Sequence, residues 1–198
     1  MAYWFWIFSF YSWAGCLLER AYAHRTSGEA HPVRRCMLLL PLCPVYGLSM
    51  TALLTLPPSM RQGLWLPVAG AAAATFMEYF YHLLCQRLFG VRFWDYSGVP
   101  GNVEGRVCVP FSLAWGGLSA LAVWIIQPPL EALIARVPPA LTLTALLIFT
   151  ADAVCSARLL AVTHSVSALR GVTLTPRRGA AFPATRPDPP SPPGGTRH

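Results

Sequence analysis

Five apolar segments, each long enough to cross a lipid bilayer as a helix, limit the fold more than any other feature of the sequence. They lie near residues 3–22, 37–56, 63–85, 109–127 and 140–162. About 20 apolar residues are needed to span a hydrocarbon core roughly 30 Å thick. The stretches between the segments contain arginine, proline or both. We therefore predict an all-α, polytopic membrane helix bundle of about five transmembrane helices over residues 1–170.

The few charged residues exclude several functions. All basic residues are arginine, and 15 of them against 8 acidic residues give a net charge of +7. Without lysine, Schiff-base chemistry and a lysine-dependent phosphate-binding loop are excluded. The five spans also leave no room for a folded ATPase domain. Because no basic region precedes the first apolar segment and no small-residue cleavage site follows it, we expect this segment to stay as an anchor.

The arginines predict an orientation, because arginine-rich loops stay in the cytoplasm. Only Arg61 and Arg136 lie on one side of the five-span arrangement, and Arg158 lies inside the fifth span. The other side holds Arg20, Arg25, Arg34, Arg35, Arg87, Arg92, Arg106, Arg170, Arg177, Arg178, Arg186 and Arg197. We therefore predict a multi-pass plasma-membrane protein with its N-terminus outside and its C-terminus in the cytoplasm. The positive charge then signals topology and contact with the lipid bilayer, not a nucleic-acid partner.

The C-terminal segment, residues 171–198, is rich in proline, glycine and arginine and has no hydrophobic periodicity. Such a composition cannot form a packed core, so we predict a disordered tail.

The six cysteines all fall in the inner half of the predicted bundle, and no CxxC or histidine-rich spacing occurs. In a reducing cytoplasm they are expected to be small apolar packing residues rather than a disulfide framework. We predict no metal site and no cofactor.

Ionisable residues inside a span are costly and call for a partner or a function. Glu78 lies about eight residues from the inner end of the third segment, roughly 12 Å deep at the rise of an α-helix. Two helix faces carry polar residues at the spacing i, i+4, i+7: Glu78, His82 and Cys85, and Ser12, Cys16 and Glu19. If these faces meet, they form a polar seam open to the cytoplasm. The seam would bind a cation, relay a proton, or hold the bundle together by hydrogen bonds.

The second segment has Pro41 and Pro44 near its cytoplasmic start, on either side of Cys43. Proline removes a backbone donor and clashes with the preceding turn, so we predict a kinked or broken helix. The break is either a wall of a substrate site or a kink repaired by neighbouring helices.

Two more patterns concern helix packing. Small residues at 70–74 and 116–120 permit close contact between helices. Asp152 and Arg158 are six positions apart and do not share a helix face, so each is expected to meet another helix or water.

A polar loop follows the third segment, and its chemistry differs from the rest of the chain. It carries ring, acceptor and donor side chains between turn-forming glycines and prolines: Trp94, Asp95, Tyr96, Ser97, Asn102, Glu104 and Arg106. We predict that it folds at the inner interface or dips into the bundle.

Four blocks of sequence carry a family resemblance: SWAGCLLE (12–19), PLCPVYG (41–47), MEY (77–79) and WDYSGVPGNVEGRVCVPFSLAWG (94–116). On these blocks the chain resembles the putative type IV ABC-transporter permease family. The motif positions are Glu19, Pro41, Cys43, Pro44, Tyr46, Gly47, Glu78, Trp94, Asp95, Tyr96, Asn102, Gly105, Arg106 and Cys108. The family usually has tryptophan after the first-span glycine, whereas Cys16 follows Gly15 here.

The resemblance implies the membrane component of an export or uptake system, with its ATPase on a separate subunit because this chain has no phosphate-binding loop. Loops 23–36 and 86–108 would dock the ATPase, and Glu19, Glu78 and Arg106 would line a cytoplasmic vestibule. Five helices rarely enclose a route alone, so a homo-oligomer or partner is expected. Two alternatives are open: an intramembrane enzyme for lipid-linked substrates, with Glu78 or Asp95 as base and Arg106 at the headgroup, and a scaffold binding through the loop.

Overall fold

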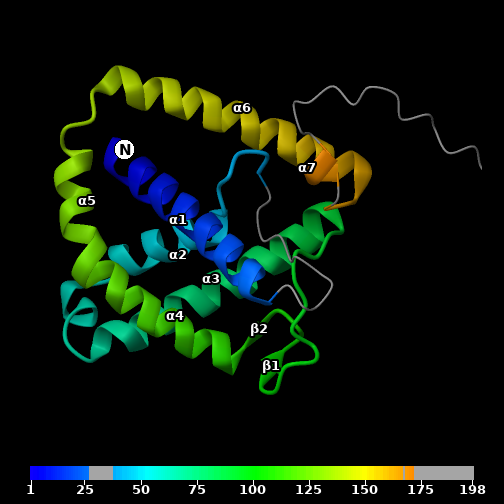
Figure 1. Ribbon diagram of the computed structural model, residues 1–198, viewed down its shortest axis with the longest axis horizontal. Coiled ribbons are helices and arrows are strands. Elements are labelled where there is room, and N and C mark those ends of the chain that lie inside the picture. Colours follow the sequence, from blue (N-terminus) through cyan, green and yellow to red (C-terminus); the bar gives the residue numbers. More distant parts are fainter. Residues whose placement is uncertain (27–37, 167, 172–198) are drawn as a thin grey trace, which may run out of the picture.

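The computed structural model describes residues 1–26, 38–166 and 168–171, and these are mostly helical (Figure 1). The long helices are α1 (Ala2–Thr26), α3 (Trp65–Phe89), α6 (Pro139–Thr163) and the continuous run of α4 (Val109–Leu121), the π-helical η2 (Ala122–Ile126) and α5 (Gln127–Ile134). The shorter ones are α2 (Pro44–Thr55), the 3-10 helix η1 (Pro58–Arg61) and α7 (Ala168–Gly171). Apart from Gly171, the predicted tail lies outside the described residues.

Two of the described helices are long and apolar enough to cross a membrane, Val109–Ile134 and Pro139–Thr163. Only 22% and 11% of their most apolar windows are buried inside the protein. A core helix of a soluble protein would hide its apolar residues, whereas these helices present them outward. This exposure indicates a membrane protein.

The predicted second span, 37–56, is not one continuous helix. Helix α2 starts only at Pro44, has 12 residues and is preceded by non-helical backbone at residues 38–43. The predicted break at Pro41 and Pro44 is therefore confirmed. Cys43 is the extended N-cap, and Pro44 occupies the first helical turn, where its missing N–H costs nothing. At 1.5 Å per residue, α2 alone is about 18 Å long, too short to span a bilayer.

The non-helical residues 38–43 bond to neighbouring helices. The backbone N–H of Leu39 donates to Ser156 Oγ (3.1 Å), and that of Leu40 donates to Asp152 Oδ1 (3.3 Å). The backbone N–H of Cys43 donates to the Ser12 carbonyl (2.9 Å). Such irregular backbone is tolerated inside a membrane protein only where protein partners satisfy it. Asp152 thus meets another element, as predicted, and Arg158 is exposed.

The predicted fourth span, 109–127, continues seven residues further, to Ile134. Pro128 and Pro129 lie inside this extension, although proline lacks the donor for the carbonyl four residues before it. The π-helical turn Ala122–Ile126 lies directly before this proline pair. A widened turn changes the hydrogen-bond register locally, which lets the helix pass the prolines.

Small residues bring α3 and α4 close together, as predicted. A Cβ placed on Gly70 would collide with the Ser119 side chain, and one on Gly116 would lie 2.7 Å from the Pro67 carbonyl oxygen. Helix α2 packs against both α1 and α3. On its α1 side, a Cβ on Gly15 would overlap the Tyr46 ring. Glycine at these positions therefore sets the distance between helices.

A two-stranded antiparallel hairpin, β1 (Asn102–Val103) with β2 (Val107–Cys108), follows α3 and corrects the all-α prediction. The turn needs left-handed backbone at Glu104 (φ 53°) and Gly105 (φ 67°). In Figure 1 the hairpin and α7 lie toward one end of the molecule, and the start of α1 and the α5–α6 connection lie at the other.

Candidate functional site

Helix α2 packs against both α1 and α3, the helices that carry the two polar faces predicted to form a seam. Its Tyr46 hydroxyl donates a 2.5 Å hydrogen bond to Glu19 Oε1 of α1. An aromatic side chain of α2 thus takes part in the polar face of α1, and the three helices form one arrangement.

Glu78 lies at the centre of this arrangement and is only 2% exposed. Its Oε1 accepts a hydrogen bond from the Tyr96 hydroxyl (3.0 Å), and its Oε2 accepts one from Trp115 Nε1 (2.9 Å). The donors come from the loop before the hairpin and from α4. Hydrogen bonds to a carboxylate are strong and offset part of its desolvation cost. The buried carboxylate therefore ties α3 to two distant parts of the chain.

The rings of Tyr46 and Trp115 connect the surroundings of Glu19 and Glu78. Their centroids are 5.3 Å apart and their planes are nearly perpendicular, the edge-to-face geometry that aromatic pairs favour. We call the series Glu19, Tyr46, Trp115 and Glu78 the aromatic bridge. It brings together three of the predicted site residues and one, Trp115, that the sequence did not single out.

A mostly apolar groove runs along the aromatic bridge. Its empty volume, including the open side, is about 860 Å³. Side chains from α1 to η2 line it, among them Tyr11, Leu18, Tyr46, Trp115 and Leu118, and Glu78 is the only acidic or basic residue among the lining residues that the structure describes. Ligand pockets commonly have this composition, with apolar walls and a few polar groups.

His82 is buried one turn after Glu78 but faces the loop. Its Nε2 lies 3.0 Å from the carbonyl oxygen of Trp94, which can only accept, so Nε2 carries the proton. Its buried Nδ1 has no hydrogen-bond partner among the residues that the structure describes. The His82 and Trp94 rings also meet edge to face, with centroids 5.1 Å apart. His82 thus fastens the loop to α3 rather than completing a set of ligands with Glu78.

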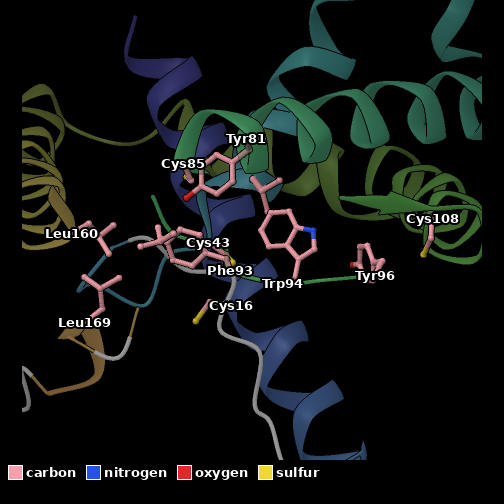
Figure 2. Packing of buried hydrophobic residues seen from close by; sticks show 12 residues of the cluster. Cys16, Cys43, Tyr81, Cys85, Phe93, Trp94, Tyr96, Cys108, Leu160 and Leu169 are labelled. Atoms are coloured by element: carbon pink, nitrogen blue, oxygen red, sulfur yellow. The ribbon is translucent and has the colours of Figure 1, made fainter. Parts of the chain in front are cut away.

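Trp94 holds the base of the hairpin. Its Nε1 donates to the Arg106 carbonyl (2.8 Å), and its ring stacks on Tyr81 with centroids 6.3 Å apart (Figure 2). The surrounding cluster also contains Cys16, Cys43 and Cys85, each at most 4% exposed. These cysteines act as small apolar packing residues, as the sequence analysis predicted.

Arg106 does not join Glu19 and Glu78, contrary to the predicted vestibule. Its guanidinium forms an ion pair with Glu104 and donates to the Tyr79 hydroxyl (2.9 Å). The Tyr79 hydroxyl in turn donates to Glu104 Oε2 (2.9 Å). Neighbouring residues on a helix point in different directions, so the side chains of Tyr79 and Glu78 lie on different faces of α3. Arg106 therefore braces the hairpin against the other face of α3.

Asp95 and Asn102 shape the loop through local hydrogen bonds. The hydroxyl and backbone N–H of Ser97 both donate to Asp95 Oδ1, at 2.5 and 2.8 Å, and these bonds hold the pKa of the exposed Asp95 carboxyl below its usual value. Asn102 Nδ2 donates to the Val99 carbonyl (2.8 Å), and Asn102 Oδ1 accepts from the Gly105 N–H (3.1 Å). A carboxylate held in this way is a turn-forming group and a weakened base.

A second polar cluster lies at the opposite end of the helices and was missed by the sequence analysis. The hydroxyl of Tyr3 donates to Glu131 Oε1 (2.8 Å), and the hydroxyl of Tyr11 donates to Gln127 Oε1 (2.9 Å). Gln127 and Glu131 are also hydrogen-bonded to each other. Their i, i+4 spacing was a usable signal, but the predicted span ended at residue 127 and excluded Glu131.

Comparison with known proteins agrees with the sequence motifs. Residues 6–157, well over half of the chain, match the family described as "Putative ABC-transporter type IV". No curated protein and no solved structure matches the chain. The matched region contains the aromatic bridge, the groove and the hairpin. The chain therefore belongs to the "Putative ABC-transporter type IV" family.

Proposed function

We propose that this protein is a multi-pass permease subunit that works with a separate ATPase subunit. The observation that carries the proposal is Glu78, a buried acidic side chain at the bottom of an apolar groove between helices. An ionisable residue in such a place marks a substrate or ion pathway more often than a packing position. Membership of a transporter family agrees with this function.

Five membrane crossings are compatible with the lengths of the elements. Helices α1, α3 and α6 each have 25 residues, and Val109–Ile134 has 26. The second crossing would be made by α2, about 18 Å long, together with the bent, non-helical residues 38–43 before it. Because α2 alone is shorter than a hydrocarbon core of about 30 Å, this crossing would be a broken one. A broken crossing of this kind is typical of transporters.

The orientation follows from the arginines. Arg25 and Arg87 lie in the last turns of α1 and α3, and Arg106 lies in the turn of the hairpin, whereas Arg61 lies in η1 and Arg136 follows α5. The positive-inside rule makes the hairpin end cytoplasmic. The docking surface for the ATPase would then be formed by loop 86–108, which contains the hairpin, and by loop 23–36. Most of loop 23–36 lies outside the described residues.

Isolation of the tagged full-length chain from native membranes tests the proposal. We expect an ATPase with a phosphate-binding loop to be recovered with it. Val103→Glu, at the exposed surface of the hairpin, should reduce that recovery. Leu64→Glu, at an exposed apolar position before α3 and thus at the opposite end, is the matched control and should not. A protein isolated without any ATPase would overturn the permease function, and recovery of a different membrane protein would favour the scaffold.

A further inference from the structure

The groove along the aromatic bridge is a partly open recess between helices. The space in it that admits water-sized molecules is about 210 Å³, and its lining has the composition of a ligand pocket, with apolar walls and few polar groups. The groove exists because its floor and walls include small residues, among them Ala14, Gly15 and Ala74. Gly15 in particular lets the Tyr46 ring lie directly against α1. The walls are therefore preformed by helix packing rather than by a mobile loop.

The chemistry of the lining selects one sign of charge. Glu78 is the only residue lining the described groove that carries a full charge when ionised, and that charge is negative. Its carboxylate is held beside the ring of Trp115, which donates to it through Nε1. An anionic ligand would meet this carboxylate in a medium of low dielectric constant, where like charges repel strongly. Charge complementarity thus favours a cation.

Aromatic rings at the same place favour an organic cation over a small inorganic one. Tyr46 and Trp115 meet edge to face, and both line the groove together with Tyr11. The faces of such rings attract cations, most of all weakly hydrated ones. The remaining lining is aliphatic, including Leu18, Met50 and Leu118. A ligand with a delocalised positive charge and a large apolar surface satisfies both the carboxylate and the walls.

We propose that the groove binds a lipophilic organic cation, with Glu78 as counter-charge and Tyr46 and Trp115 as ring contacts. As a statement about the transported substrate, this inference rests on the proposed permease function. Binding itself requires neither the ATPase nor ATP.

The test uses two ions of the same shape and opposite charge. Equilibrium dialysis of the purified full-length protein in lipid nanodiscs, against empty nanodiscs, measures binding of tetraphenylphosphonium and of tetraphenylborate. In separate dialyses, we expect saturable binding of the phosphonium and no binding of the borate above that to empty nanodiscs. Glu78→Gln should weaken phosphonium binding at least about tenfold. Glu104→Gln, at an exposed carboxylate of the hairpin that does not line the groove, should leave it unchanged.

A second pair of variants keeps the test decisive if Glu78→Gln does not fold. Leu118→Trp fills the groove and retains the carboxylate, whereas Leu113→Trp makes the same change at an exposed position of α4 outside the groove. Only Leu118→Trp should abolish binding. Equal phosphonium binding in all variants, or equal saturable binding of tetraphenylborate, would overturn the proposal. If the phosphonium does not bind but an ATPase is recovered from native membranes, only the substrate class is refuted. If the phosphonium binds but no ATPase is recovered, only the permease function is refuted.

Discussion

Glu78 connects three parts of the chain that are distant in sequence: helix α3, the loop that leads into the hairpin, and helix α4. It does so through the Tyr96 hydroxyl and the Trp115 indole N–H. A carboxylate in an apolar bundle is tolerated only with such donors. The same bonds hold its charge at the groove, so structure and proposed function depend on the same contacts.

Trp115→Phe is expected to destabilise the protein, because it removes the donor to Glu78 Oε2 and keeps most of the ring. Leaving one oxygen of a buried carboxylate without this bond costs on the order of 1–3 kcal/mol. The midpoint of thermal unfolding in detergent should therefore fall. Trp124→Phe is the control, because Trp124 is exposed on the π-helical turn. Equal midpoints for the two variants would contradict the role of Trp115.

The loop should loosen in acid because of Asp95. Its hydrogen bonds from Ser97 favour the charged carboxylate and lower its pKa in the folded protein. These hydrogen bonds therefore stabilise the folded loop fully above the pKa of Asp95 in the unfolded chain, about 3.9. This stabilisation is lost as the pH falls through the lower pKa of Asp95 in the folded protein. Hydrogen–deuterium exchange of peptides from residues 94–106, corrected for intrinsic rates, should increase below about pH 4. Asp95→Asn should remove this pH dependence, and an unchanged wild-type profile would refute the assignment.

The sequence indicated some members of the aromatic bridge but not their contacts. Glu78 and Glu19 stood out because charges are scarce in the spans, and Tyr46 belongs to a family block. Trp115 also lies in a family block, residues 94–116, but the apolar run around it gives no sign of its bond to Glu78, because that bond joins two helices. Arg106 was wrongly placed beside Glu19 and Glu78 because its position in a loop does not show that it pairs with Glu104 and Tyr79.

At the level of elements, α1 and α6 could be predicted closely because each is one uninterrupted apolar run. The break before α2 was also predictable, since Pro41 and Pro44 exclude a helix there. The continuation of the helix from α4 into α5, past Pro128, could not be predicted. The π-helical turn that precedes Pro128 depends on the register of the helix, which the sequence does not show. The hairpin was read only as a turn-rich loop, since two-residue strands are too short to show alternation.

The contact between α3 and α4 gives a matched pair of substitutions at adjacent positions. Gly116 faces the Pro67 carbonyl and Ala71, whereas a Cβ on Gly117 would meet nothing within 4 Å. Gly116→Leu should force the helices apart and cost several kcal/mol, as overpacking does. Gly117→Leu should change the unfolding temperature little. Similar losses of stability for both would show that the helices do not meet at Gly116.

At the level of the whole molecule, the proposed permease function depends on which end of the helices faces the cytoplasm. The ATPase surface, the predicted C-terminal tail and the hairpin are all assigned to the same end. Among the helices of the described residues, two meet the length and hydropathy criteria for a span. If only these two crossed, residue 62 and residue 198 would lie on the same side of the membrane. Five crossings place them on opposite sides.

Reporter fusions at these two positions make the most direct measurement. Alkaline phosphatase is active only outside the cytoplasm, and green fluorescent protein, exported through the general secretory route, fluoresces only inside it. Five crossings predict an active phosphatase after residue 62 and a fluorescent protein after residue 198. The same reporter active at both positions would contradict the proposed topology, and with it the cytoplasmic hairpin and its ATPase.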